Sequence, residues 1–251
     1  MRVKVLKNAE ELGKEAALQA ADILKKAIST QGKARLLLST GASQFETLKA
    51  LVKMDLAWDK VEMFHLDEYV GLPESHQASF RGYLKQRFTN LVNLKQAYFV
   101  NGEGDVEANI RNLSLELRKE PIDLGLVGVG ENSHIAFNDP PANFDTKEAY
   151  IVVKLDEQCK QQQVGEGWFA NLDEVPKEAI TMTVFQIMQC KTIIAPVPHQ
   201  VKADAIRRML ENDVTNLIPA TKLKEHPNCT LLIDENSASQ VAKSVLMEFG
   251  S

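Results

Sequence analysis

Apolar residues recur along this 251-residue chain in two patterns that alternate from one segment to the next. Apolar positions spaced three and four residues apart predict helices, and short apolar runs predict strands. The expected helices are 9–26, 44–54, 80–91, 106–118, 201–210 and one within 175–188. The expected strands are 34–38, 61–66, 98–100, 122–127, 149–155, 191–195 and 229–233. Residues 1–5 are expected to lead directly into the first helix.

Strands that alternate with helices are typical of a parallel sheet covered on both faces. The prediction is therefore an α/β fold: a three-layer, doubly wound, Rossmann-like and mostly parallel sheet with helices on both faces. A chain of this length can bury a full core. The sequence contains no internal repeat, low-complexity tract or evident linker, so we expect residues 1–251 to form a single domain.

Polar or glycine-containing clusters follow four of the apolar runs. They are Ser39-Thr40-Gly41-Ala42-Ser43, Asp67-Glu68-Tyr69, the loop from Gly128 to Asp139, and Pro198 to Lys202. In an open α/β sheet, ligands bind beyond the carboxyl ends of the strands. Since parallel strands place those ends on one edge, the four clusters are expected to form a shared site.

The loop from Gly128 to Asp139 carries the most chemical information. Gly128 and Gly130 permit a tight turn and close approach of a ligand to the backbone. His134 stands between Asn132 and Asp139, and a histidine that titrates near neutral pH suits proton transfer. The alternative is a structural histidine, which is the commoner role after a strand. The loop lacks the third glycine of a dinucleotide-binding turn.

The other clusters have chemical and structural interpretations. Ser39 to Ser43 could cradle an anion at a helix start or could simply cap the helix. Asp67 could act as a general base or belong to a solvated turn. Lys202 could bind a phosphate as a point charge or lie on the surface. No Gly-Lys-Ser/Thr follows the first cluster, so it is not a Walker loop.

Composition narrows the class of protein. The net charge of −5 argues against a nucleic-acid surface. Cys159, Cys190 and Cys229 are odd in number and widely spaced, which favours a reducing cytoplasm over a disulfide framework. No signal peptide or membrane-spanning run is evident. His76, His199 and His226 lack metal-ligand spacing, so no metal site is expected.

Taken together, these residues resemble the glucosamine-6-phosphate deaminase (isomerase) family over nearly the whole chain. The strongest signals are Leu66-Asp67-Glu68-Tyr69-Val70-Gly71-Leu72-Pro73 and Gly128-Val129-Gly130 with His134-Ile135-Ala136-Phe137-Asn138-Asp139-Pro140. The related 6-phosphogluconolactonases share the fold but have an arginine after Asp-Glu, where this chain has Tyr69. The resemblance thus favours the deaminase side of the family.

The resemblance implies that an amino-sugar 6-phosphate opens its ring, isomerises from aldose to ketose and loses ammonia, and it implies no metal or organic cofactor. Asp67 would move the proton between C1 and C2, and His134, with Asn132 and Asp139 beside it, would serve ring opening. Lys202 and the segment Ser39–Ser43 would hold the phosphate. Glu68, Gly128 and Gly130 would contact the substrate.

The chain departs from the family pattern in the histidine loop. The family usually has aspartate at Asn132, glycine at Ser133 and glutamate at Asp139, and its phosphate-binding arginine has no counterpart in Gln161-Gln162-Gln163. An amide can orient imidazole but cannot stabilise its cationic form as a carboxylate does. Alternatives therefore remain: galactosamine 6-phosphate as substrate, a 6-phosphogluconolactonase-type hydrolase, or a non-catalytic sugar-phosphate sensor. Assembly into a homo-oligomer is also open.

Overall fold

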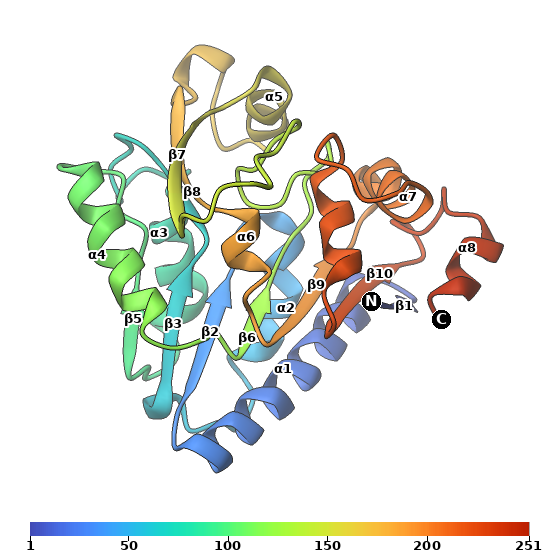
Figure 1. The fold of residues 1–251 in the computed structure, drawn as a ribbon, viewed down its shortest axis with the longest axis horizontal. Helices are drawn as coiled ribbons and strands as arrows, with labels where there is room; N and C mark the ends of the chain where they lie inside the picture. The colour runs from blue at the N-terminus through green and yellow to red at the C-terminus, as the bar shows by residue number, and fades with distance from the viewer. Residues whose placement is uncertain (251) are drawn as a thin grey trace.

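A computed structural model describes residues 1–250 and is built on one seven-stranded parallel sheet (Figure 1). In spatial order its strands are β1 (Arg2–Leu6), β10 (Cys229–Asp234), β9 (Thr192–Val197), β6 (Leu124–Leu126), β2 (Ala34–Leu38), β3 (Val61–His65) and β5 (Gln96–Tyr98). Every neighbouring pair in this sheet is parallel. The predicted α/β class and mostly parallel sheet are therefore confirmed.

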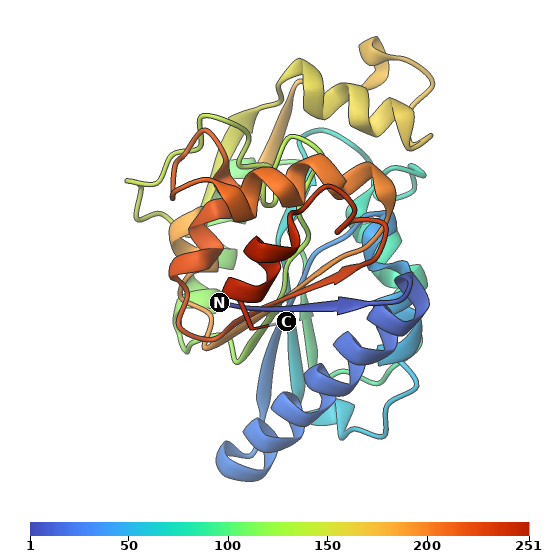
Figure 2. The same cartoon turned by 90° about the vertical axis from the view of Figure 1, so that its right-hand side faces the viewer.

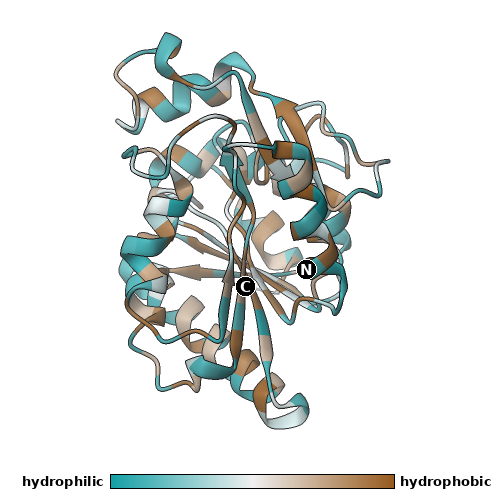
Figure 3. Cartoon of the chain, turned by 90° about the vertical axis from the view of Figure 1, so that its left-hand side faces the viewer, coloured by the Kyte–Doolittle hydropathy of each residue, from teal (hydrophilic) through white to brown (hydrophobic). Residues whose placement is uncertain are grey.

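Side-chain alternation along the strands divides the core into two layers. Leu36 and Leu38 pack with one set of helices, whereas Leu37 belongs to the cluster on the other side. This follows from the strand geometry, in which successive side chains point to opposite faces. The first face is covered by α1 (Ala9–Gln31), α2 (Phe45–Leu51) and α3 (Phe80–Leu84), and the second by α4 (Val106–Arg118), α6 (Val184–Ile187) and α7 (Ala203–Glu211). In Figure 3 the apolar colour follows the strands, and the helices alternate between apolar and polar stripes.

The first element differs from the expectation. Residues Arg2–Leu6 form the edge strand β1, paired in parallel with β10, before α1 begins. Figure 2 shows β1 and β10 side by side, with the two ends of the chain close together. The backbone N–H of Val3 donates to the Phe249 carbonyl at 3.4 Å, just after α8 (Lys243–Glu248). The partner of β1 is more than 220 residues away, so local patterning could not reveal this strand.

A second, three-stranded antiparallel sheet lies beyond the carboxyl edge of the main one (Figure 1). It contains β4 (Asp67–Tyr69), β8 (Glu178–Met182) and β7 (Tyr150–Lys154). The expected helix within 175–188 is thus mainly a strand followed by the single turn of α6. The helix α5 (Glu157–Gly165) was also not expected; with this sheet it encloses an apolar cluster that includes Tyr69 and Phe137.

The winding of the main sheet reverses between β2 and β6. From β2 the chain proceeds outward through β3 and β5, and from β6 it proceeds the other way through β9 and β10. Such a reversal leaves a crevice outside the carboxyl ends of the two central strands. Ser39 and Gly128 follow these two strands, which places their loops at the reversal point. Among the described helices, none combines the length and apolar character needed to cross a membrane.

Candidate active site

An open pocket lies at this reversal point. The pocket brings together most of the sequence-predicted residues: Ser39, Thr40, Gly41, Ala42, Ser43, Asp67, Gly128, Gly130, His134 and Lys202. The loops that carry them follow β2, β3, β6 and β9, which are four adjacent strands. The expectation of a shared rim is therefore met in the geometry.

The segment Ser39–Ser43 forms one wall of the pocket. Gly41 has φ 97° and ψ 169°, a backbone conformation that favours glycine, and its carbonyl accepts a hydrogen bond from Tyr83 Oη at 2.9 Å. The Ser39 hydroxyl is buried without a hydrogen-bond partner among the described residues. A buried polar group without a partner is uncommon, and here it faces a pocket that a polar ligand can enter.

Asp67 and Glu68 point in opposite directions from β4. Asp67 lines the pocket. Burial, with a further contribution from the Glu68 charge, raises the pKa of Asp67 well above its usual value. A carboxylate with a raised pKa is a better proton acceptor when it is ionised.

Glu68 is completely buried and does not reach the pocket, contrary to the expectation of substrate contact. It accepts hydrogen bonds from Ser79 Oγ at 2.8 Å and from the Arg81 backbone N–H at 2.9 Å, and it pairs with Arg81 Nε at 3.2 Å. The reason is strand alternation, which turns Glu68 toward the start of α3 when Asp67 faces the pocket. Glu68 thus anchors the helix start and keeps β4 in place.

The loop from Gly130 to His134 is a closed turn. The Gly130 N–H donates to the His134 carbonyl at 2.9 Å, and the Ser133 N–H donates to the Gly130 carbonyl at 3.0 Å. A β-carbon added to Gly130 would lie 2.5 Å from His134 Cδ2 and closer still to Cε1 and Nε2. Gly130 is therefore required because the imidazole lies directly against its α-carbon.

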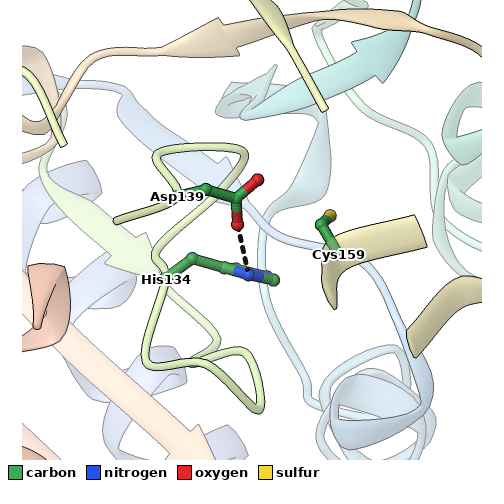
Figure 4. A group of neighbouring side chains, drawn as sticks. All are labelled: His134, Asp139 and Cys159. Atoms are coloured by element: carbon green, nitrogen blue, oxygen red, sulfur yellow. Dashed lines mark ion pairs between the residues drawn. The ribbon is translucent and has the colours of Figure 1, made fainter. Parts of the chain in front are cut away.

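His134 is supported by Asp139 (Figure 4) and by Asn132, and neither of these two residues lines the pocket. His134 Nδ1 is 3.0 Å from Asp139 Oδ1, an ion-pair distance, although the N–H direction does not meet hydrogen-bond geometry. Asn132 uses both ends of its amide: Oδ1 accepts from the His134 N–H and Nδ2 donates to Asp139 Oδ1, both at 3.0 Å. Asn132 and Asp139 can therefore position His134 but do not line the pocket themselves.

The surroundings of Asp139 favour its charged form. Burial acts to raise the pKa of this carboxyl, but the contacts with His134 and the Asn132 amide outweigh burial, and the pKa lies below its usual value. Farther along the loop, Asn138 Nδ2 donates to the Ile135 and Met182 carbonyls, both at 2.8 Å. These bonds fix the histidine loop to β8.

Lys202 enters the pocket from the turn after β9. The backbone of this turn is held by two hydrogen bonds. The His199 N–H donates to the Asp234 carboxylate, and the Lys202 N–H donates to the His199 carbonyl at 3.0 Å. His199 itself has a positive φ of 82°. The Lys202 side chain is only 5% exposed and makes no ion pair with the described residues. Burial lowers the pKa of Lys202, an effect that the nearby Glu166 and Glu131 charges partly offset. An anion in the pocket would compensate this buried cation.

Residues of the segment 162–168 line the pocket and were missed by sequence reasoning. They are Gln162, Gln163, Glu166 and Trp168. Glu166 accepts from Gln162 Nε2 at 2.7 Å and from Trp168 Nε1 at 2.9 Å, and Gln163 Oε1 is buried without a partner. Lys160, near which the family arginine was sought, pairs instead with Glu157 at 3.1 Å and stays outside the pocket.

His65, the other histidine close to a cluster, is packed in β3. It is completely buried, and burial, helped by the Arg81 charge, lowers its pKa to about 3. The ring is therefore neutral at pH 7.

Comparison with known proteins places this site in a family. The profile for glucosamine-6-phosphate isomerases/6-phosphogluconolactonase matches residues 7–232. The glucosamine-6-phosphate deaminase of Lactobacillus delbrueckii subsp. bulgaricus is 36% identical over 240 residues, which cover 95% of this chain and 99% of the relative. That of Streptococcus uberis is 33% identical over 242 residues, covering 96% and 100%.

Solved structures give the same result. A monomeric glucosamine-6-phosphate deaminase superposes with a TM-score of 0.88 at 31% identity, covering 96% of this chain and 100% of that one. The 6-phosphogluconolactonase of Shewanella baltica superposes with a TM-score of 0.78 at 17% identity, covering 93% and 97%, and shares the fold. The profile match, the relatives and the structure together show that this chain belongs to the family of glucosamine-6-phosphate isomerases and 6-phosphogluconolactonases.

Proposed function

We propose that this protein is an amino-sugar-6-phosphate deaminase that converts glucosamine 6-phosphate to fructose 6-phosphate and ammonia. The observation that carries the proposal is that Asp67, His134 and the unpaired Lys202 line one pocket. A base, a second proton carrier and an anion site are the groups that the reaction needs. The full-length similarity to glucosamine-6-phosphate deaminases supports the same conclusion.

The phosphate would bind between Lys202 and the segment Ser39–Ser43. Lys202 supplies a buried positive charge, and Ser39 supplies a buried hydroxyl that lacks a partner. Binding energy from this remote group can hold the reacting carbons in position, which accelerates the chemical step as well as strengthening binding.

Ring opening would use His134. A proton leaves the C1 hydroxyl and another reaches the ring oxygen as the C1–O5 bond breaks, giving the open-chain aldose. The Asp139 carboxylate lies 3.0 Å from Nδ1 of His134, and Asn132 holds both the His134 backbone and the Asp139 carboxylate in place.

Isomerisation would use Asp67. Its carboxylate takes the proton from C2 and returns it to C1, while O1 gains a proton and the amino nitrogen loses one, so that the 2-amino aldose becomes the C2 imine of the ketose. Water then adds at C2, the C–N bond breaks, and ammonia leaves as the ketone forms. The raised pKa of Asp67 suits it to accept a proton from carbon.

The role of Asp67 is tested by Asp67→Asn. The variant should lose exchange of the C2 hydrogen with heavy water while retaining phosphosugar binding, because asparagine has a similar shape but cannot accept the proton. Asp22→Asn is a matched control, since Asp22 is exposed on α1 outside the pocket. Exchange that persists in Asp67→Asn would assign the base to another group.

The reaction itself is tested by measuring ammonia released from glucosamine 6-phosphate and galactosamine 6-phosphate, beside hydrolysis of 6-phosphogluconolactone. Ammonia from either amino sugar supports a deaminase, and the faster of the two identifies the preferred epimer. Hydrolysis of the lactone alone would indicate a lactonase. Binding without any product would indicate a sugar-phosphate sensor.

We also propose that the protein acts in the cytoplasm as one domain spanning residues 1–251. The three cysteines are buried and free, which suits a reducing compartment. The histidine loop is bonded to β8, so the two sheets share the site.

A further inference from the structure

Cys159 lies beside the His134–Asp139 pair, although the proposed reaction does not use it. One donor atom from each of His134, Asp139 and Cys159 lies within 4.8 Å of the other two. The three residues come from the histidine loop and from the first turn of α5, and Figure 4 shows their side chains around a common space. The intervals between them along the chain, 5 and 20 residues, match no metal-binding motif, so only the fold reveals the group.

Among the described residues, two buried polar atoms of this group have no hydrogen-bond partner. They are Nδ1 of His134 and Oδ2 of Asp139. Buried polar atoms are nearly always satisfied, by protein, water or an ion, so each calls for an explanation. A cation held between the three side chains would satisfy both atoms at once.

The distances suit a small divalent ion. Two donors on one tetrahedral zinc ion lie roughly 3.3–3.6 Å apart, given zinc bonds of about 2.0–2.3 Å. His134 Nδ1 and Asp139 Oδ1 are already 3.0 Å apart. Since no pair of donors exceeds 4.8 Å, the thiol must approach by about 1.2–1.5 Å at most (4.8 minus 3.6 or 3.3).

The donor types also select the ion. Imidazole nitrogen, thiolate and carboxylate are the three protein ligands of zinc, whereas magnesium and calcium prefer oxygen alone. A thiolate and one carboxylate balance the two charges of Zn²⁺, so the buried site would be neutral. Asn132 Nδ2 donates to Asp139 at 3.0 Å and would orient this ligand as an outer-shell partner.

We propose that His134, Asp139 and Cys159 form an inhibitory site for Zn²⁺ or another thiophilic divalent cation. The metal replaces the proton of the Cys159 thiol, and it takes His134 and Asp139 out of ring opening. The inhibition rests on the proposed function of His134, but metal binding does not depend on it.

Binding is tested with Co²⁺, a spectroscopic substitute for zinc, added to the full-length protein. Sulfur ligation gives a near-ultraviolet charge-transfer band, and four-coordination gives strong visible bands. Both should appear in the wild type and in Cys190→Ser, a control in which a buried cysteine outside the group is changed. The charge-transfer band should be lost in Cys159→Ser. Its absence from the wild type, or its persistence in Cys159→Ser, would overturn the site without reference to any activity.

Inhibition is tested with Zn²⁺ in the ammonia-release assay. The wild type should be inhibited and should recover with EDTA. Cys159→Ala should keep its activity without metal and need at least about tenfold more Zn²⁺ for the same inhibition, because one of three ligands is gone. Equal sensitivity of the two proteins would refute an inhibitory role. A cobalt spectrum with sulfur ligation but no deaminase activity would retain the metal site and reject the proposed function instead.

Discussion

Gly130→Ala should displace the His134 imidazole while leaving the rest of the site in place. The added β-carbon would lie 2.5 Å from His134 Cδ2, whereas ordinary contact begins at 3.4 Å. The ring must therefore withdraw by at least 0.9 Å (3.4 minus 2.5). The backbone of Gly130 needs no left-handed conformation, so the change acts on the imidazole rather than on the turn.

A displacement of about 1 Å in a reacting group can cost roughly 100-fold in rate. We expect kcat for ammonia release to fall by about this factor. KM should change much less, because Lys202 and Ser39, which would hold the phosphate, lie on other loops. Steady-state kinetics with glucosamine 6-phosphate would separate the two effects.

Gly128→Ala is the matched control in the same loop. Its β-carbon would lie 3.3 Å from Gln44 Nε2 and 3.6 Å from Ser43 Oγ, so neighbours need to move by only a few tenths of an ångström. The variant should keep kcat within about tenfold of the wild type. If Gly130→Ala turns over as fast as Gly128→Ala while circular dichroism shows both folded, the position of His134 does not limit catalysis and the reasoning fails.

Three further changes test the charges around the pocket. Lys202→Ala should reduce kcat/KM by about 10- to 100-fold, which corresponds to the loss of one charged hydrogen bond, whereas Lys160→Ala, outside the pocket, should leave kcat/KM unchanged. If the two variants have the same kinetics, Lys202 has only a structural role. Asp67→Asn should raise the free energy of unfolding at pH 7, because the pKa of the Asp67 carboxyl is raised in the folded state and its ionisation therefore destabilises the fold. Below about pH 4, the pKa of an unfolded aspartate, the wild-type carboxyl is protonated in both states. Urea titrations should therefore show that the variant's extra stability disappears below that pH. Asn132→Asp replaces a donor to Asp139 with a second negative charge; it should raise the Asp139 pKa and shift the acid limb of the pH–rate profile upward, and an unmoved limb would exclude ionised Asp139 from the mechanism.

The sequence predictions failed at positions where contacts between distant segments determine the structure. Glu68 was expected at the substrate, but Ser79 and Arg81 draw it into a buried cluster on the other side of β4. The segment 175–188 contains the expected helix only as the short α6, and its earlier part forms the unexpected strand β8, which pairs with β4 and β7. A short apolar run does not itself distinguish strand from buried helix, and available partners make the choice.

The sequence alone determined the α/β class and the four loops of the site. Apolar periodicity depends on nearby residues, and parallel strands necessarily place their carboxyl ends on one edge, so the pattern itself groups Ser39, Asp67, His134 and Lys202. Only the tertiary structure showed that Gly130 lies against His134 and that Glu68 points away from the pocket. It also brought Glu166 and Cys159 to the site from a segment in which the sequence shows no functional motif. These features depend on side-chain direction and on contacts across the fold, which a local pattern of apolar and polar residues does not specify.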